Sequence, residues 1–178
     1  YDDYESFLRA GSVDGWARKY GLEQYPYYLR TLKHPAYDAF WQGQALDKLL
    51  VQHPSQVPTM WEQGLFDQED MWGAIHSFQA LRNAGHGANN FLVMGPWRHS
   101  GANYDGTVLG DLKFEGDTAL QWRRDILKPF FDHYLKDKAA PVTPKAMIYN
   151  VGANRWDRFD DWPLSCEANC SNPLTPLF

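Results

Sequence analysis

The sequence predicts a mixed α/β fold in which parallel strands are flanked by helices. A short apolar segment from about Thr59 to Gly64 precedes a stretch with helical spacing, and a second apolar run follows from about Asn90 to Met94. A strand, a helix of roughly a dozen residues and another strand form a βαβ unit, in which the two strands run parallel. Parallel sheets carry helices on both faces and bind ligands at the carboxyl ends of their strands.

The composition of the 178 residues is that of a globular chain. Hydrophobic residues make up 44% and aromatic residues 16%, which is enough apolar surface to offset the entropy lost on folding. The net charge of -5 and the lack of a basic tract argue against nucleic acid or an anionic membrane as a partner. No apolar run approaches the ~20 residues that span a bilayer. We therefore expect neither kind of partner.

Residues 1–53 predict a set of short helices. Apolar residues recur at spacings of three and four, most clearly over residues 37–50, where they form one broad stripe. Pro26, Pro35 and Pro54 separate the helical stretches. The chain begins without Met, and its acidic first residues lack the apolar core of a signal peptide, as we expect of a fragment.

Residues 54–138 hold the βαβ unit and a long helix. Asp67 lies just past the end of the first strand, and His99 follows the second strand. Gly85 ends the helix between them. After a loop rich in Gly and Asn, Asp117 or Thr118 caps a long helix over residues 117–136, which runs to about Lys136. A kink is expected in this helix at Pro129.

Residues 139–178 predict a linker and the start of a second, β domain. The linker is polar and contains proline, and the next residues have the pattern of a strand, a turn and an aromatic edge. Cys166 and Cys170 have a spacing that suits neither a redox CxxC pair nor a zinc site. A short-loop disulfide is favoured over two unrelated loop cysteines, and it would indicate an oxidising compartment.

Asp67 and His99 are the candidate catalytic pair. In a catalytic triad the histidine takes the proton of a serine and later returns it, while a carboxylate holds the imidazole tautomer and stabilises its charged form. Neighbouring parallel strands bring positions 67 and 99 together. The alternative is that Asp67 caps the following helix and that His99 is a loop histidine. Glu69 and Asp70 are rival acids, although both also suit a helix N-terminus.

A nucleophile and a metal site are both missing from the sequence. No serine lies in the G-x-S-x-G pattern between a strand and a helix, and Ser100 adjoins His99 too closely to be aimed at it. The remaining histidines lack ligand spacing, so we expect no metal and no cofactor. They are His34, His53, His76, His86 and His133.

Long motifs carry a resemblance to a known family. They read HPAYDAFWQGQALDKLL, VPTMWEQGLFDQEDMWGAIHSFQAL, LVMGPWRHSG, FEGDTALQWRRDILKPFFDHYLK and IYNVGANRWDRFDDWP. In these motifs the sequence resembles the α-amino-acid ester hydrolases, in the group of serine hydrolases that includes cocaine esterase, glutaryl-cephalosporin acylases and X-Pro dipeptidyl-peptidases. The resemblance implies a partial α/β-hydrolase. Residues 1–53 would form a helical cap segment, residues 54–138 the C-terminal part of the hydrolase domain, and residues 139–178 a linker and the start of a jelly-roll domain.

The resemblance also implies roles for individual residues. Asp67 would be the triad acid and His99 the general base, while the serine would lie upstream of Tyr1, so that the chain alone is inactive. Members of the family bind the substrate α-ammonium with a cluster of carboxylates. Asp38 resembles a cap contribution to that cluster, although Ala39 stands where a second acid is expected. An ordinary acid near a helix N-terminus is the alternative for Asp38.

Tyr37 and Trp72 are candidates for an acyl pocket, with core packing favoured for each. The implied activity is hydrolysis or transfer of the acyl group of α-amino-acid esters and amides, including β-lactam antibiotics with an α-amino acyl group, through an acyl-enzyme. A small-molecule ester or amide, assembly into a homo-oligomer and a periplasmic or secreted location are the corresponding expectations. A general carboxylesterase, an X-Pro dipeptidyl-peptidase and a non-catalytic binding module are the alternatives.

Overall fold

The computed structural model describes residues 2–139 and 143–163 of the chain. The chain divides into two compact units, Tyr1–Ala45 and Leu46–Phe178. Helix α5 (Leu46–Gln52), which the sequence analysis assigns to the cap segment, packs against helix α6 (Gly73–Asn83) of the second unit, and the domain boundary at residue 53 stays a prediction. Cys166 and Cys170, with their predicted disulfide, lie outside the described residues.

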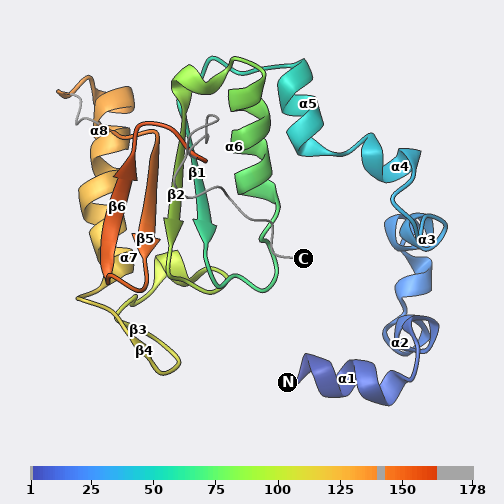
Figure 1. Cartoon of the computed structure of the whole chain (residues 1–178). Helices are drawn as coiled ribbons and strands as arrows, with labels where there is room; N and C mark the ends of the chain where they lie inside the picture. Colours follow the sequence, from blue (N-terminus) through green and yellow to red (C-terminus); the bar gives the residue numbers. More distant parts are fainter. Residues whose placement is uncertain (1, 140–142, 164–178) are drawn as a thin grey trace, which may run out of the picture. The chain divides into compact units, whose positions relative to one another are not determined.

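The first unit is a series of short helices, as the sequence predicts (Figure 1). The N-terminal helices have side-chain caps: Asp2 accepts a hydrogen bond from Glu5, and Ser12 accepts one from Gly15. The stripe over residues 37–50 does not form one helix, because the chain leaves helical geometry after Gln42 and resumes it at Leu46. The helices are α1 (Asp3–Ala10), α2 (Val13–Tyr20), η1 (Leu22–Gln24), α3 (Pro26–Leu32) and α4 (Ala39–Gln42).

The second unit is built on one four-stranded sheet with the order β1-β2-β5-β6. Its strands are β1 (Thr59–Gly64), β2 (Asn90–Gly95), β5 (Ala146–Asn150) and β6 (Arg155–Phe159). The first three run parallel and β6 runs antiparallel to β5. Helix α6 covers one face, and a longer helical stretch covers the other (Figure 1). The predicted fold class, parallel strands flanked by helices, is confirmed.

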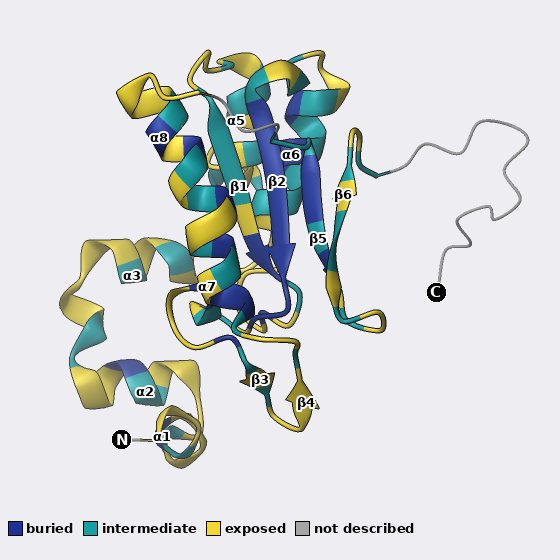
Figure 2. Cartoon of the chain, turned by 90° about the vertical axis from the view of Figure 1, so that its left-hand side faces the viewer, coloured by how far each residue is buried: buried dark blue, intermediate teal, exposed yellow. Residues whose placement is uncertain are grey.

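Apolar side chains fill both faces of the sheet, and strand β2 is buried along its whole length (Figure 2). On one face Phe78 of α6 packs with Leu92 and Met94 of β2. On the other face Val93 packs with Trp122 of the long helical stretch. The alternation along β2 follows from the strand period of two, which sends successive side chains to opposite faces.

Strands β5 and β6 continue the four-stranded sheet of the second unit. Residues 146–148 of β5 pair with residues 92–94 of β2, and Ala146, Met147 and Tyr149 are buried against the rest of the unit. The polar linker suggested a domain boundary, but a change in composition does not show which strand a later segment pairs with. The predicted jelly-roll start, as far as it concerns residues 164–178, lies outside the described residues.

The long helix predicted over residues 117–136 is present in three parts. It is capped by Asp117, which accepts from the Leu120 N–H, and it comprises α7 (Thr118–Trp122), the π-helical η4 (Arg123–Leu127) and α8 (Lys128–Lys136). Pro129 has no N–H to bond residue 125, and the π-helical turn just before it uses wider bonds, such as that from Lys128 N–H to Arg123 O. The irregularity expected at the proline is thus a π segment.

Among the described residues, no helix has both the length and the apolar character of a membrane span. The connections between the main elements carry smaller elements. A two-stranded hairpin lies between β2 and α7 and turns at Gly110, which has a positive φ of 56°. These elements are η2 (Gly87–Asn89), η3 (Gly101–Asn103), β3 (Val108–Leu109) and β4 (Leu112–Lys113).

Candidate active site

The loops after β1 and β2 lie side by side at the carboxyl edge of the sheet. Strand pairing ends at Gly64 and Gly95, but the backbone bonds continue: Leu65 N–H donates to Gly95 O at 2.8 Å, and Phe66 N–H donates to Trp97 O at 3.0 Å. The residues after these bonds are therefore brought to the same place.

Trp97 holds this turn against the sheet. Its side chain is buried, and its indole N–H donates to Thr118 Oγ1 at 3.0 Å. The fit leaves no room for larger residues: a Cβ on Gly95 would lie 2.4 Å from the indole ring, and one on Gly64 would lie 2.5 Å from Trp97 O. The two glycines thus allow the close approach that fixes the path of the chain into His99.

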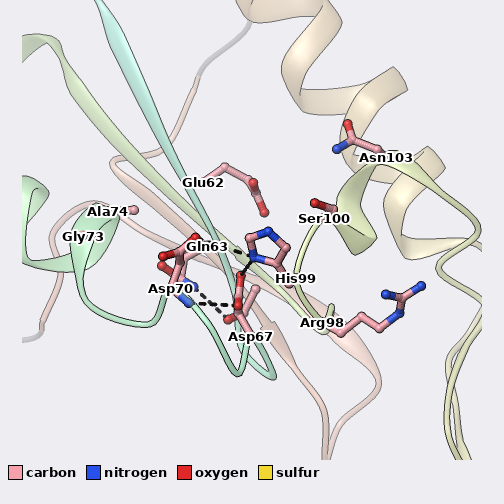
Figure 3. A pocket seen from close by; sticks show the side chains of 11 residues that line it. Glu62, Gln63, Asp67, Asp70, Gly73, Ala74, Arg98, His99, Ser100 and Asn103 are labelled. Atoms are coloured by element: carbon pink, nitrogen blue, oxygen red, sulfur yellow. Dashed lines mark hydrogen bonds and ion pairs between the residues drawn. The ribbon is translucent and has the colours of Figure 1, made fainter. Parts of the chain in front are cut away.

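Asp67 and His99 are joined by a hydrogen bond in which 3.2 Å separates Asp67 Oδ2 from His99 Nδ1 (Figure 3). The other carboxylate oxygen accepts the backbone N–H groups of Glu69 and Asp70 at 2.9 and 3.0 Å. Burial alone would raise the pKa of Asp67, but these N–H groups and His99 outweigh it, so the pKa lies below its ordinary value. Asp67 is therefore an oriented carboxylate that stays ionised.

A helix-capping role for Asp67 and a role for Glu69 or Asp70 as the partner of His99 fit the structure less well. Helix α6 begins at Gly73 and has no side-chain cap, so Asp67 does not cap it. Asp70 Oδ2 lies 3.6 Å from His99 Nδ1, and Glu69 Oε2 lies 3.9 Å from His99 Nε2, but their side chains are 76% and 61% exposed. The Asp67 side chain is 10% exposed and closest to the imidazole.

A cavity of about 330 Å³ opens beside the pair. Sequence reasoning missed one of its lining residues, Glu62, and the signal that could have found it is an acid within a segment expected to form a buried strand. The Glu62 residue is exposed to solvent, yet the protein atoms around its carboxyl desolvate it and raise its pKa, with a further contribution from the charge of Asp67. The site therefore contains two acids with opposite shifts.

Arg123 supports the loop that carries His99, and sequence reasoning missed this residue too. From the π-helical turn its guanidinium donates to the carbonyl oxygens of Ala102 and Tyr104. Ser100, directly after His99, adopts a left-handed backbone with φ of 59°. The loop is thus shaped by a backbone turn at one end and by an arginine at the other.

Of the predicted substrate residues, Trp72 is not among those that line this pocket, and Asp38 and Tyr37 belong to the first unit. Asp38 belongs to the first unit, where it accepts from the Phe40 N–H at 2.9 Å and contacts His34 Nδ1 at 2.6 Å, a bond that lowers its pKa. This is the local role of an acid at a helix start, and ammonium binding by Asp38 stays a prediction. Tyr37 and Trp72 are 61% and 66% exposed rather than packed in a core, and Trp72 stacks on His76; a place for either in an acyl pocket stays a prediction.

Ser100 is the serine that lines this pocket, and it is the chain neighbour of His99. Within residues 2–139 and 143–163, no group of three or more His, Cys, Asp or Glu is arranged to hold a metal ion. The chemistry that these side chains offer is proton transfer by an imidazole whose partner is a buried carboxylate.

One family model and several solved structures match the chain. The model of the X-Pro dipeptidyl-peptidase (S15) family matches residues 1–101, and no curated protein matches. The solved structure of a selenomethionine-labelled α-amino acid ester hydrolase is 56% identical over 96% of this chain, with a TM-score of 0.84. An aminopeptidase from the marine sediment archaeon Thaumarchaeota archaeon is 44% identical over 92% of this chain, also with a TM-score of 0.84.

The chain spans 28% of the length of the first of these proteins and 27% of the second. The two solved structures match 96% and 92% of this chain, and the family model alone covers more than half of the 178 residues. The chain therefore belongs to the X-Pro dipeptidyl-peptidase (S15) family.

Proposed function

We propose that this chain carries the general base and the orienting acid of a serine hydrolase that acts on esters and amides of α-amino acids. One observation carries the proposal: a buried, ionised Asp67 is bonded to His99 at the carboxyl ends of two adjacent parallel strands. Membership of the S15 family supports it, as does the likeness to a solved α-amino acid ester hydrolase.

The geometry suggests how the pair would work. Because Asp67 occupies Nδ1, the imidazole keeps its proton there and leaves Nε2 as the basic nitrogen. Nε2 would take the proton of a serine hydroxyl as that oxygen attacks the substrate carbonyl, and would then return the proton to the leaving group. Asp67 would stabilise the imidazolium that exists between the two transfers.

We place the nucleophile outside these 178 residues. No serine of the chain lies in a G-x-S-x-G pattern, and the solved relatives are more than three times as long as the part that matches. The isolated chain should therefore not hydrolyse esters, whereas a longer protein that includes it should do so through a covalent acyl-enzyme.

The substrate class is tested with two esters that differ in one group. An α-amino-acid methyl ester and the same ester without its amino group are offered to the longer protein. We expect kcat/KM to be at least tenfold higher for the amino ester, since losing a desolvated charge contact costs about 1.4 kcal/mol or more. A β-lactam nucleus added as acceptor should yield acylated product. Equal turnover of both esters would point to a general carboxylesterase.

An exopeptidase is the second candidate, because the family model describes X-Pro dipeptidyl-peptidases and one solved relative is an aminopeptidase. The same longer protein is assayed with an X-Pro anilide and with an amino-acid anilide. If either anilide is turned over faster than the α-amino ester, the result would favour an exopeptidase over an ester hydrolase.

A further inference from the structure

Glu62 occupies an unusual place in strand β1. Successive side chains of a strand point to opposite faces, so Met60 and Glu62 share one face while Trp61 lies on the other. Met60 packs against the apolar cluster that contains Val93 and Trp97, and Glu62 pairs with Val93 across the strands. Trp61 packs instead with the cluster on the α6 face. Glu62 is therefore an acid on an apolar sheet face, two residues before the strand ends at Gly64.

The pocket brings this acid to the catalytic pair. Glu62 lines the same cavity as Asp67 and His99, and its carboxyl is directed toward the imidazole from the strand side (Figure 3). The other charged groups near the ring are the carboxylates of Asp67, Asp70 and Glu69, whereas the guanidinium of Arg98 points away from it (Figure 3). No α6 side chain that lines the cavity is charged, since these are Gly73 and Ala74.

We propose that Glu62 is a positioning residue for His99, whose ionised carboxylate stabilises the imidazolium from the sheet side of the pocket. Asp67 does so through a bond to Nδ1, and Glu62 adds a second negative charge from a position within strand β1, whereas Glu69 and Asp70 lie on the loop after that strand. The role in catalysis rests on the proposed function, but the electrostatic contact between Glu62 and His99 can be measured without any turnover.

The direction in which each titration changes follows from the charges of the two groups. Desolvation and Asp67 raise the pKa of Glu62, so it gains its charge at a higher pH than an ordinary glutamate. Opposite charges on the two side chains would favour each other, so that removal of either group is expected to change the titration of its partner. Glutamine at position 62 keeps the shape of the side chain and removes only its charge.

The test is an NMR titration of the imidazole signals in the 178-residue chain, with the His99 signal assigned from its loss in His99→Gln. We expect Glu62→Gln to lower the His99 midpoint by about 0.5 pH unit, as for a charge several Å away in a half-exposed pocket. Asp111→Asn, an exposed change in the β3–β4 turn, should leave the midpoint where it is. An equal shift of the His99 midpoint in both variants would show that the midpoint follows the net charge of the chain rather than the position of Glu62. That result would overturn the inference.

The reciprocal titration keeps Glu62 in place, so it tests the contact between Glu62 and His99 even if Glu62→Gln does not fold. In His99→Gln the midpoint of the Glu62 carboxyl carbon should move up by a similar amount, and no movement would refute the contact. In the longer protein, Glu62→Gln should shift the acid limb of kcat/KM downward. If the NMR shifts occur but His99→Ala remains active, the contact stands and the proposed function fails.

Discussion

Asp67 has a carboxylate that its surroundings hold in a single orientation. Both carboxylate oxygens have partners: two backbone N–H groups hold Oδ1, and His99 lies at Oδ2. The backbone bonds prevent the carboxylate from turning and keep it ionised. Asp70 and Glu69 have the same charge and lie within 4 Å of the imidazole, but they are exposed and lack such anchors. Position and burial, rather than charge, distinguish the acid that orients the histidine.

Asp67→Asn in the longer protein tests this distinction. The amide can donate to Nδ1, which would force the imidazole into the wrong tautomer, and kcat should fall on the order of 10³- to 10⁴-fold. The control is Asp70→Asn, for which kcat should stay within about threefold because exposed ion pairs contribute little. Steady-state kinetics with an α-amino ester provides the measurement, and similar losses in the two variants would show that the acid is shared.

At the scale of elements, the site depends on how closely β1 and β2 approach where they end. Gly64 and Gly95 face Trp97, and the backbone bonds of residues 65 and 66 carry the strand register into the loops. The π-helical turn adds a second support, because Arg123 reaches the carbonyls behind His99. The geometry of the Asp67–His99 pair is therefore set by the strand ends and by the helical turn that carries Arg123.

Gly64→Ala and Gly73→Ala form a matched pair of tests. A Cβ at position 64 would meet the Trp97 carbonyl oxygen at 2.5 Å, so we expect the free energy of unfolding to fall by about 1–3 kcal/mol. A Cβ at position 73 meets nothing within 4 Å, and alanine at this helical position should be neutral or stabilise by up to about 1 kcal/mol. Urea unfolding measures both, and an unchanged midpoint for Gly64→Ala would contradict the packing described above.

At the scale of the whole molecule, the sequence could predict what depends on local pattern. The strand from Thr59 to Gly64, the helix after it and the closeness of Asp67 to His99 follow from apolar periodicity and from the rule that parallel strands end at one edge. The resemblance to known hydrolases supplied the family and the roles that periodicity alone left open.

Features that depend on distant contacts were not predictable in the same way. β5 joins β2 across more than 50 residues of chain, and the polar linker before it suggested a boundary where the sheet in fact continues. The helical pattern of residues 37–50 concealed a break, and aromatic character alone did not show that Tyr37 and Trp72 are exposed. Glu62 was missed because its significance lies in what the fold places around it.

The proposed role of His99 as the general base of a serine hydrolase is tested by His99→Ala in the longer protein, assayed with an α-amino ester. We predict that kcat falls at least about 10⁴-fold while the protein stays folded, because no other base of the pocket is held by a buried carboxylate. His53→Ala, an exposed change after α5, should keep kcat within about twofold. Turnover by His99→Ala equal to that of the unaltered protein would contradict the account.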